Sequence, residues 1–141
     1  MTDADRDALR VSLTADEGVR LKPYRCPAGK LTIGIGRNLD DRGISEATAL
    51  QMLDEDIDLH AKELETAFPW VLDLDPVRYR VLVNMAFNMG IRVLSQFKTT
   101  LGHVRRGEYD EAATAMLYST WSSQVKGRAR RLAQEMRTGV A

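Results

Sequence analysis

The sequence of 141 residues predicts an α+β fold that is mainly α-helical. Two observations support this prediction. From about Leu21 to Gly36 the apolar residues follow the period of short strands on either side of a Pro-Ala-Gly turn, and from Ser45 onward they recur at helical spacing. We expect one domain over residues 1–141, with a β-hairpin lobe at about 18–44, a connecting helix at about 45–66 and a helical lobe made of about 1–17 and 67–141.

The first helix and the hairpin come first in the chain. The helix is expected to end at Glu17, because Gly18 adopts positive φ without a Cβ penalty and so suits the position after a helix. In the hairpin, Cys26 should end the first strand, Pro27-Ala28-Gly29 should form the turn, and Thr32 should lie on the returning strand. Such a hairpin can direct two side chains toward a carboxyl group at the helix end.

Five further helices are expected. Ser45 caps a long one that runs to about Thr66. Pro76 opens another that continues to Met89 and is closed by Gly90; it is apolar over most of its surface, as a central core helix would be. The remaining three are predicted at about 93–106, 109–118 and 126–136.

Glu17, Cys26 and Thr32 form the most informative set of polar residues, with eight residues between the first two and five between the last two. A carboxyl group, a second ionisable group and a hydroxyl are the parts needed to break a glycosidic bond with water. Glu17 would protonate the leaving oxygen, which requires partial burial. Cys26 could be a base, a nucleophile or only a group that positions water, and Thr32 would hold the water. Alternatively, Glu17 is an ordinary surface acid at the end of a helix, and Cys26 is a packed strand residue without a catalytic role.

Other chemistries are less well supported. A cysteine–histidine hydrolase is disfavoured, because Cys26 precedes a turn and no peptidase signature surrounds it. One cysteine and two well-separated histidines show no metal-ligand spacing, and no glycine loop for phosphate is present. We therefore expect neither a metal nor a cofactor.

Charge and composition limit the expected partners and location. Formal net charge is zero, but from Leu117 to the end five basic residues accompany one acid, Glu135. This segment either attracts an anionic polymer or is a solvated helix face. The polar, acidic N-terminus lacks a secretory signal, no stretch is long enough to cross a membrane, and the lone Cys26 permits no intrachain disulfide. We expect a monomer with no nucleic-acid partner and no stable membrane association.

Five motifs in order carry a resemblance over nearly the whole chain, from about Leu13 to Thr138. They are Glu17-Gly18 with the run from Thr32 to Gly36, the run Asn-Met-Ala-Phe-Asn-Met-Gly at 84–90, residues 110–113 with Trp121, residues 127–131, and residues 137–139. In these motifs and their spacing the chain resembles the phage-type lysozymes, the endolysin family typified by the lysozyme of T-even phages.

The resemblance implies a lysozyme-like fold with a cleft between two lobes. It also implies a muramidase that hydrolyses the β-1,4 bond between N-acetylmuramic acid and N-acetylglucosamine of bacterial peptidoglycan, for host lysis. The residues that it implies are Glu17, Cys26 and Thr32 for catalysis, and Phe87, Asn88, Thr100 and Arg128 for substrate binding, with Arg128 paired to Glu17.

The resemblance further implies a holin as partner. The protein would stay in the host bacterial cytoplasm until the membrane is permeabilised and would then reach the periplasm and cell wall. A lytic transglycosylase acting on the same bond and a catalytically inactive glycan-binding module remain alternatives. The family usually has aspartate where this chain has Cys26, a variation that some relatives share. The segment from Gly36 to Ile44 is also short compared with the T-even form, so the β lobe should be the hairpin and little more.

Overall fold

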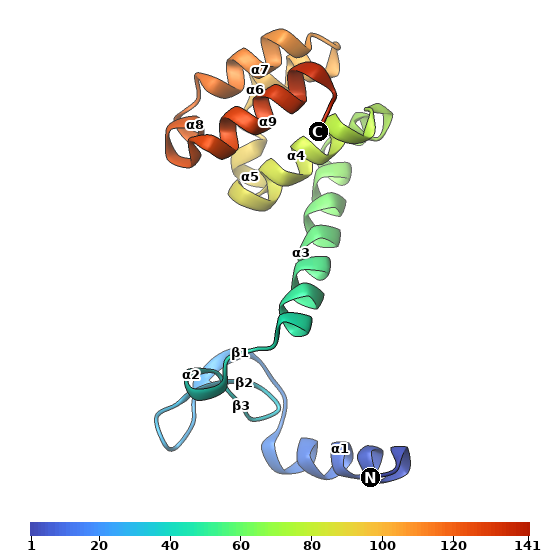
Figure 1. Cartoon of the computed structure of the whole chain (residues 1–141), viewed down its shortest axis with the longest axis vertical. Coiled ribbons are helices and arrows are strands. Elements are labelled where there is room, and N and C mark those ends of the chain that lie inside the picture. Colours follow the sequence, from blue (N-terminus) through green and yellow to red (C-terminus); the bar gives the residue numbers. More distant parts are fainter. The chain divides into compact units, whose positions relative to one another are not determined.

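The structure is a computed structural model that describes residues 1–141. The chain divides into two compact units, residues 1–51 and residues 52–141. Figure 1 labels most of the elements and colours the chain from the N-terminus to the C-terminus. Most residues are helical, and the strands form a single antiparallel sheet of three strands. The predicted α+β class, mainly helical, is therefore confirmed.

Helix α1 (Asp3–Glu17) opens the first unit and is closed at both ends by local hydrogen bonds. The Thr2 hydroxyl accepts from the Asp5 amide at 3.1 Å, and the Asp5 carboxylate accepts from the Thr2 amide at 2.9 Å, which is a capping box. At the other end Gly18 has φ 71°, and its amide donates to Thr14 O at 2.9 Å. The helix thus ends at Glu17, as predicted.

The sheet consists of β1 (Arg20–Arg25), β2 (Leu31–Gly34) and β3 (Arg37–Asn38), paired in that order. The predicted hairpin and its turn are confirmed. The first strand ends at Arg25, one residue before the predicted end at Cys26, and Cys26 opens the turn because its carbonyl accepts from the Gly29 amide at 2.8 Å. The β lobe also contains more than the expected hairpin, since β3 and the short helix α2 (Leu39–Arg42) follow it.

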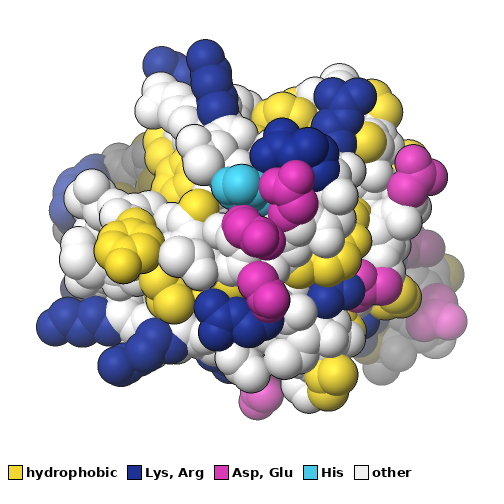
Figure 2. Space-filling model, turned by 90° about the horizontal axis from the view of Figure 1, so that it is seen from above, with side chains coloured by type: hydrophobic (Ala, Val, Ile, Leu, Met, Phe, Trp, Pro, Cys, Tyr) yellow, Lys and Arg dark blue, Asp and Glu magenta, His cyan; other side chains and the backbone are white.

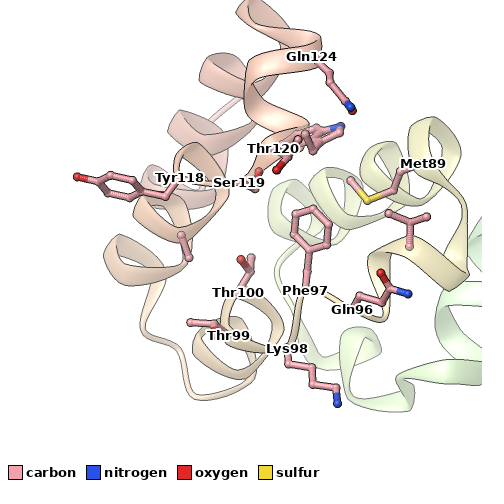
Figure 3. Close-up of a pocket in the computed structure, with 13 residues that line it drawn as sticks. Met89, Gln96, Phe97, Lys98, Thr99, Thr100, Tyr118, Ser119, Thr120 and Gln124 are labelled. Atoms are coloured by element: carbon pink, nitrogen blue, oxygen red, sulfur yellow. The ribbon is translucent and has the colours of Figure 1, made fainter.

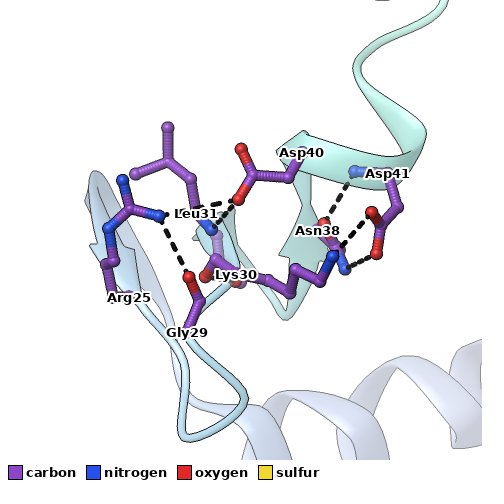
Figure 4. A network of polar contacts seen from close by, with 8 residues as sticks. Arg25, Gly29, Lys30, Leu31, Asn38, Asp40 and Asp41 are labelled. Atoms are coloured by element: carbon purple, nitrogen blue, oxygen red, sulfur yellow. Dashed lines mark hydrogen bonds and ion pairs between the residues drawn. The ribbon is translucent and has the colours of Figure 1, made fainter.

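A network of polar contacts ties α2 to the hairpin (Figure 4). The Asp40 carboxylate accepts from the Leu31 amide at 2.7 Å and lies 3.7 Å from the Arg25 guanidinium. The Lys30 ammonium lies 3.0 Å from the Asp41 carboxylate. Residues on both sides of the turn are therefore joined to α2, which holds the turn that begins at Cys26.

The remaining elements are helical. Helix α3 (Glu46–Ala67) starts after Ser45, whose hydroxyl accepts from the Thr48 amide at 3.1 Å, as the predicted cap requires. Then follow η1 (Pro69–Asp73), α4 (Pro76–Met89), α5 (Ile91–Leu94), α6 (Lys98–Arg105), α7 (Tyr109–Leu117), α8 (Thr120–Val125) and α9 (Gly127–Thr138). Helices α4, α7 and α9 were predicted with nearly these bounds, whereas η1 and α8 were not predicted.

The single helix predicted at about 93–106 is wrong, because the chain breaks between α5 and α6. The Ser95 hydroxyl donates to Ile91 O at 2.7 Å and so occupies a carbonyl of the preceding turn. The amides of Gln96 and Phe97 then bond carbonyls three residues earlier, which tightens the last turn of α5. Phe97 packs against the core, and this contact favours the break.

The buried apolar side chains lie between Leu64 and Met136, all in the second unit. Helix α4 contributes four of them, Val81, Leu82, Met85 and Ala86, which agrees with the predicted core helix. Helix α7 packs against α6 and α9, and α4 packs against α5 and α9. Full burial of a valine, leucine or methionine side chain stabilises a fold by about 1.5–3 kcal/mol. None of the helices is both long enough and apolar enough for a bilayer span.

Arg78 joins the start of α4 to the end of α9. Its guanidinium donates to Met136 O at 2.7 Å and Arg137 O at 3.0 Å, and it lies 3.0 Å from the Asp75 carboxylate. The same group lies 3.6 Å from the centre of the Tyr109 ring. Carbonyls at a helix C-terminus have no partner within the helix, so Arg78 satisfies them and holds α9 in place.

Candidate active site

Glu17 is placed by the end of α1 and by the turn between β2 and β3. Its carboxyl carbon and Oε2 both lie 2.9 Å from the point where a Cβ on Gly36 would be. The carboxyl group therefore rests directly on the backbone of Gly36, which follows the strand that carries Thr32. Within the first unit Glu17 is exposed, so residues 1–51 alone do not supply the partial burial that a general acid needs.

Cys26 and Thr32 lie on the same face of the sheet. Tyr24 pairs with Thr32 across β1 and β2, and the Cys26 amide donates to Lys30 O at 3.0 Å. Side chains two residues apart on a strand point to the same side, so the thiol and the hydroxyl are diagonal neighbours. Thr32 is only 4 % exposed, the one buried residue of the first unit, and Cys26 is half-buried.

The surroundings of Cys26 favour its thiolate. Backbone hydrogen bonding from Lys30 is the main cause that lowers the pKa of the Cys26 thiol below its usual value. Partial desolvation acts in the opposite direction, and weaker bonds from the Ala28 backbone and the Thr32 hydroxyl add to the lowering. A larger share of the thiol is ionised near neutral pH than in an unperturbed cysteine, and the thiolate is the reactive form.

The Thr32 hydroxyl has one proton to donate, and the turn competes for it. The hydroxyl donates to Lys30 O at 2.9 Å. When it does so, its oxygen is left as an acceptor for a water molecule; when it donates to the Cys26 sulfur, it stabilises the thiolate. The arrangement can therefore hold a water and stabilise an adjacent anion, but one proton cannot serve both partners at once.

Arg128 on α9 is held by Asn84 on α4. The guanidinium donates to Asn84 Oδ1 from Nε at 2.9 Å and from Nη2 at 2.7 Å, and to Asn84 O at 3.3 Å. Together with Phe87, both residues line a pocket of about 550 Å³. The predicted pairing of Arg128 with Glu17 joins residues of different units and stays a prediction. Asn84 was missed as a partner of Arg128, although it opens the recognised run at 84–90.

A second pocket, of about 730 Å³, contains Thr100 (Figure 3). Phe97 lies among the labelled side chains there, whereas Tyr118 extends away from them. Thr100 is 3 % exposed, so it forms part of the wall and offers a ligand little surface. The structure therefore places the predicted substrate-binding residues Phe87 and Arg128 in one pocket and Thr100 in another.

Asn88 is exposed and oriented by Trp121, which also lines the second pocket. The indole N–H of Trp121 donates to Asn88 Oδ1 at 2.7 Å. An indole nitrogen can only donate, so this bond fixes the amide and leaves the Asn88 NH₂ free for a ligand acceptor. Trp121 was recognised as part of a motif but not as a residue that orients the site.

Charges on the second unit are mixed: on the face shown in Figure 2, acidic and basic side chains lie beside one another. Two of the five basic residues near the C-terminus have acidic partners: Arg131 lies 2.9 Å from Glu135, and Arg137 lies 3.7 Å from Asp110. Elsewhere a hydrogen bond from Arg106, and to a lesser extent one from His103, lowers the pKa of Glu108 to about 2. These pairs agree with a solvated helix surface more than with one continuous basic patch.

Comparison with known proteins identifies the family and the relatives that this chain resembles. A model of the phage lysozyme family matches residues 14–135. The chain is 27% identical over 162 residues to probable T4-type lysozyme 1 of Dictyostelium discoideum, covering 94% of this chain and 95% of the relative. It is 31% identical over 117 residues to an endolysin of Acyrthosiphon pisum secondary endosymbiont phage 1, covering 79% and 76%.

Another similar protein is the pre-baseplate central spike protein Gp5 of Enterobacteria phage T4. The identity is 30% over 155 residues, which cover 90% of this chain but only 27% of that longer protein. The family match extends over the helix end, the hairpin and the helical unit that were described above. The chain therefore belongs to the phage lysozyme family and is a lysozyme-like peptidoglycan hydrolase, a glycoside hydrolase.

Proposed function

We propose that this enzyme is a muramidase that hydrolyses the β-1,4 bond between N-acetylmuramic acid and N-acetylglucosamine, with Glu17, Cys26 and Thr32 as its catalytic residues. The observation that carries the proposal is the arrangement in the first unit. A carboxyl group at the end of α1 rests on the turn after β2, and a thiol and a hydroxyl occupy one face of the same sheet. These are the parts that hydrolysis of a glycosidic bond needs.

Each group has a defined part in the reaction. The Glu17 carboxyl gives its proton to the glycosidic oxygen as the bond from C1 to that oxygen breaks. A bound sugar would exclude water from this exposed carboxyl and so help it keep its proton. On the other face, a water held by Thr32 attacks C1 and loses its proton to the Cys26 thiolate. The lowered pKa of Cys26 supports this role as a base, and the same thiolate could instead attack C1 directly.

Phe87, Asn88, Thr100 and Arg128 are proposed to bind the glycan. Phe87 is partly exposed and offers an apolar face to a sugar ring, and Asn88 offers an amide donor that Trp121 has already oriented. Preorganised donors lose less entropy on binding than mobile ones. Thr100 contributes through the shape of the pocket wall, because little of it is exposed.

Analysis of the digestion products tests the bond and the reaction type. Purified murein is digested, the new reducing ends are reduced with borohydride, and the amino sugar alcohols are identified after acid hydrolysis. We expect muramitol, because hydrolysis on the muramic acid side leaves that sugar with a free reducing end. Glucosaminitol would assign the enzyme to the other bond of the glycan. Non-reducing 1,6-anhydromuramic ends would identify a transglycosylase instead.

We further propose that the enzyme acts as a monomer in host lysis and depends on a holin for access to the wall. The match to the phage lysozyme family and the similarity to a phage endolysin motivate this proposal. Expressed alone in a bacterium, the protein should stay in the cytoplasm without effect on growth, and addition of chloroform should cause rapid lysis. Turbidity of the culture gives the readout, with cells that express the Glu17→Gln variant as control. Lysis on expression alone would contradict the need for a permeabilising partner.

A further inference from the structure

We infer that Gly36 is a positioning residue for catalysis, because the space left by its missing Cβ is occupied by the carboxyl group of Glu17. This inference rests on the proposed function, in which Glu17 is the general acid. It assigns a task to a residue outside the catalytic set of Glu17, Cys26 and Thr32.

The contact is close and involves the reacting end of Glu17. A Cβ on Gly36 would lie 2.9 Å from both the carboxyl carbon and Oε2, and 3.2 Å from Cγ. Two carbon atoms without a bond between them prefer about 3.5–4.0 Å, so a methyl group and this carboxyl cannot share the space. The carboxyl thus packs on the α-carbon of Gly36, and two elements determine its place: the end of α1 and the turn after β2.

Gly34 provides a matched comparison two residues earlier in the chain. Its φ is +71° and that of Gly36 is +70°, so alanine at either position suffers the same kind of backbone strain. A Cβ on Gly34 would meet no atom within 4 Å. The two glycines therefore differ in one respect, the contact with Glu17.

The contact should matter for rate more than for stability. The carboxyl is the far end of a flexible side chain, so an alanine at 36 can push it aside without moving the backbone. A general acid must lie within hydrogen-bond reach of the oxygen that it protonates, and a displacement of about 1 Å can cost up to a hundredfold in rate. Glycine at this position then keeps the acid in its productive place.

The test compares Gly36→Ala with Gly34→Ala, using soluble uncrosslinked murein strands as substrate. We expect Gly36→Ala to have a kcat at least about tenfold lower than Gly34→Ala, with KM values within about twofold of each other. The Tm values of the two variants should agree within about 2 °C, because the backbone strain is shared. In a Glu17→Gln background, Gly36→Ala should cause no further loss of rate, since no acid is left to displace.

Two results would overturn the inference. Equal kcat values for the two alanine variants would show that the carboxyl does not need the space at Gly36. A Tm of Gly36→Ala far below that of Gly34→Ala would show that the glycine serves the packing of the turn. The proposed function fails in a different way, namely if Glu17→Gln alone stays active, so the two failures can be told apart.

Discussion

Replacing Glu17 with glutamine should lower the rate of murein hydrolysis at least about a hundredfold, the low end of what a general acid contributes. Glutamine keeps the shape of the side chain and its contact with Gly36 but has no proton to give to the glycosidic oxygen. Release of soluble muropeptides from purified cell wall measures the effect. The variant should fold normally, because Glu17 is exposed and makes no ion pair within its unit.

Asp16→Asn is the matched control for Glu17→Gln. Asp16 precedes Glu17 in the last turn of α1 and is also exposed, and its replacement removes the same charge from the same helix end. We expect this variant to keep near wild-type activity. If both variants were equally impaired, loss of charge near the helix end would explain the result. If Glu17→Gln cleared cell-wall suspensions at nearly the wild-type rate, the proposed mechanism would have to be abandoned.

Local signals account for the parts of the fold that could be predicted. The end of α1 follows from Gly18, the start of α3 from Ser45 and the ends of α4 from Pro76 and Gly90, and each depends on residues within one turn. Apolar residues on most sides of the predicted helix at 76–89 identified α4 as a core helix, because such a helix has to be covered, and four of its residues are buried.

The parts that were missed depend on contacts between distant residues. The break at Ser95 precedes Phe97, which packs against the core, and α8 contains the buried Trp121; a window of local sequence reports neither contact. Helices of six residues are marginal on their own, so propensity carries little information about them.

The same distinction between local signals and distant contacts applies to the candidate site. Glu17, Cys26 and Thr32 fall within sixteen residues, and their spacing across a helix end and a hairpin could be interpreted from sequence. The bond from Arg128 to Asn84 joins residues 44 positions apart, and the contact of Glu17 with Gly36 depends on how α1 meets the sheet. Contacts between residues that lie so far apart in the sequence can be identified only from the tertiary structure.

Cys26 should tolerate replacement by aspartate better than by serine. If the thiolate is a base or nucleophile close to the sugar, Cys26→Asp keeps an ionisable group of similar size, whereas Cys26→Ser keeps the shape but does not ionise near neutral pH. We expect Cys26→Asp to keep substantial activity and Cys26→Ser to lose about a hundredfold or more, as when a base is removed. Muropeptide release measures both, and circular dichroism confirms folding.

A thiol reagent gives a second measurement on the same residue. Cys26 is the only cysteine, so a bulky reagent that inactivates the wild type should leave Cys26→Asp unaffected. Backbone hydrogen bonding from Lys30 lowers the pKa of the thiol, so the thiolate should already form below the pH at which an ordinary cysteine ionises. Modification should therefore become faster as pH rises through that lowered pKa and then level off, because the thiolate is the form that reacts.

The opposite order of the two variants would assign Cys26 a structural role. A packed residue beside Thr32 would accept serine, which matches it in size, and would suffer from aspartate, because a charge would then be placed against a face that is partly buried. The hydroxyl of Thr32 separates the two cases further. Thr32→Val keeps the shape and removes the hydroxyl, which contributes to the lowered pKa of Cys26, so modification of the thiol should shift to higher pH. If the thiolate is catalytic, the pH profile of hydrolysis should shift by the same amount. If Cys26 is purely structural, the pH profile of hydrolysis should not follow the shift in thiol reactivity.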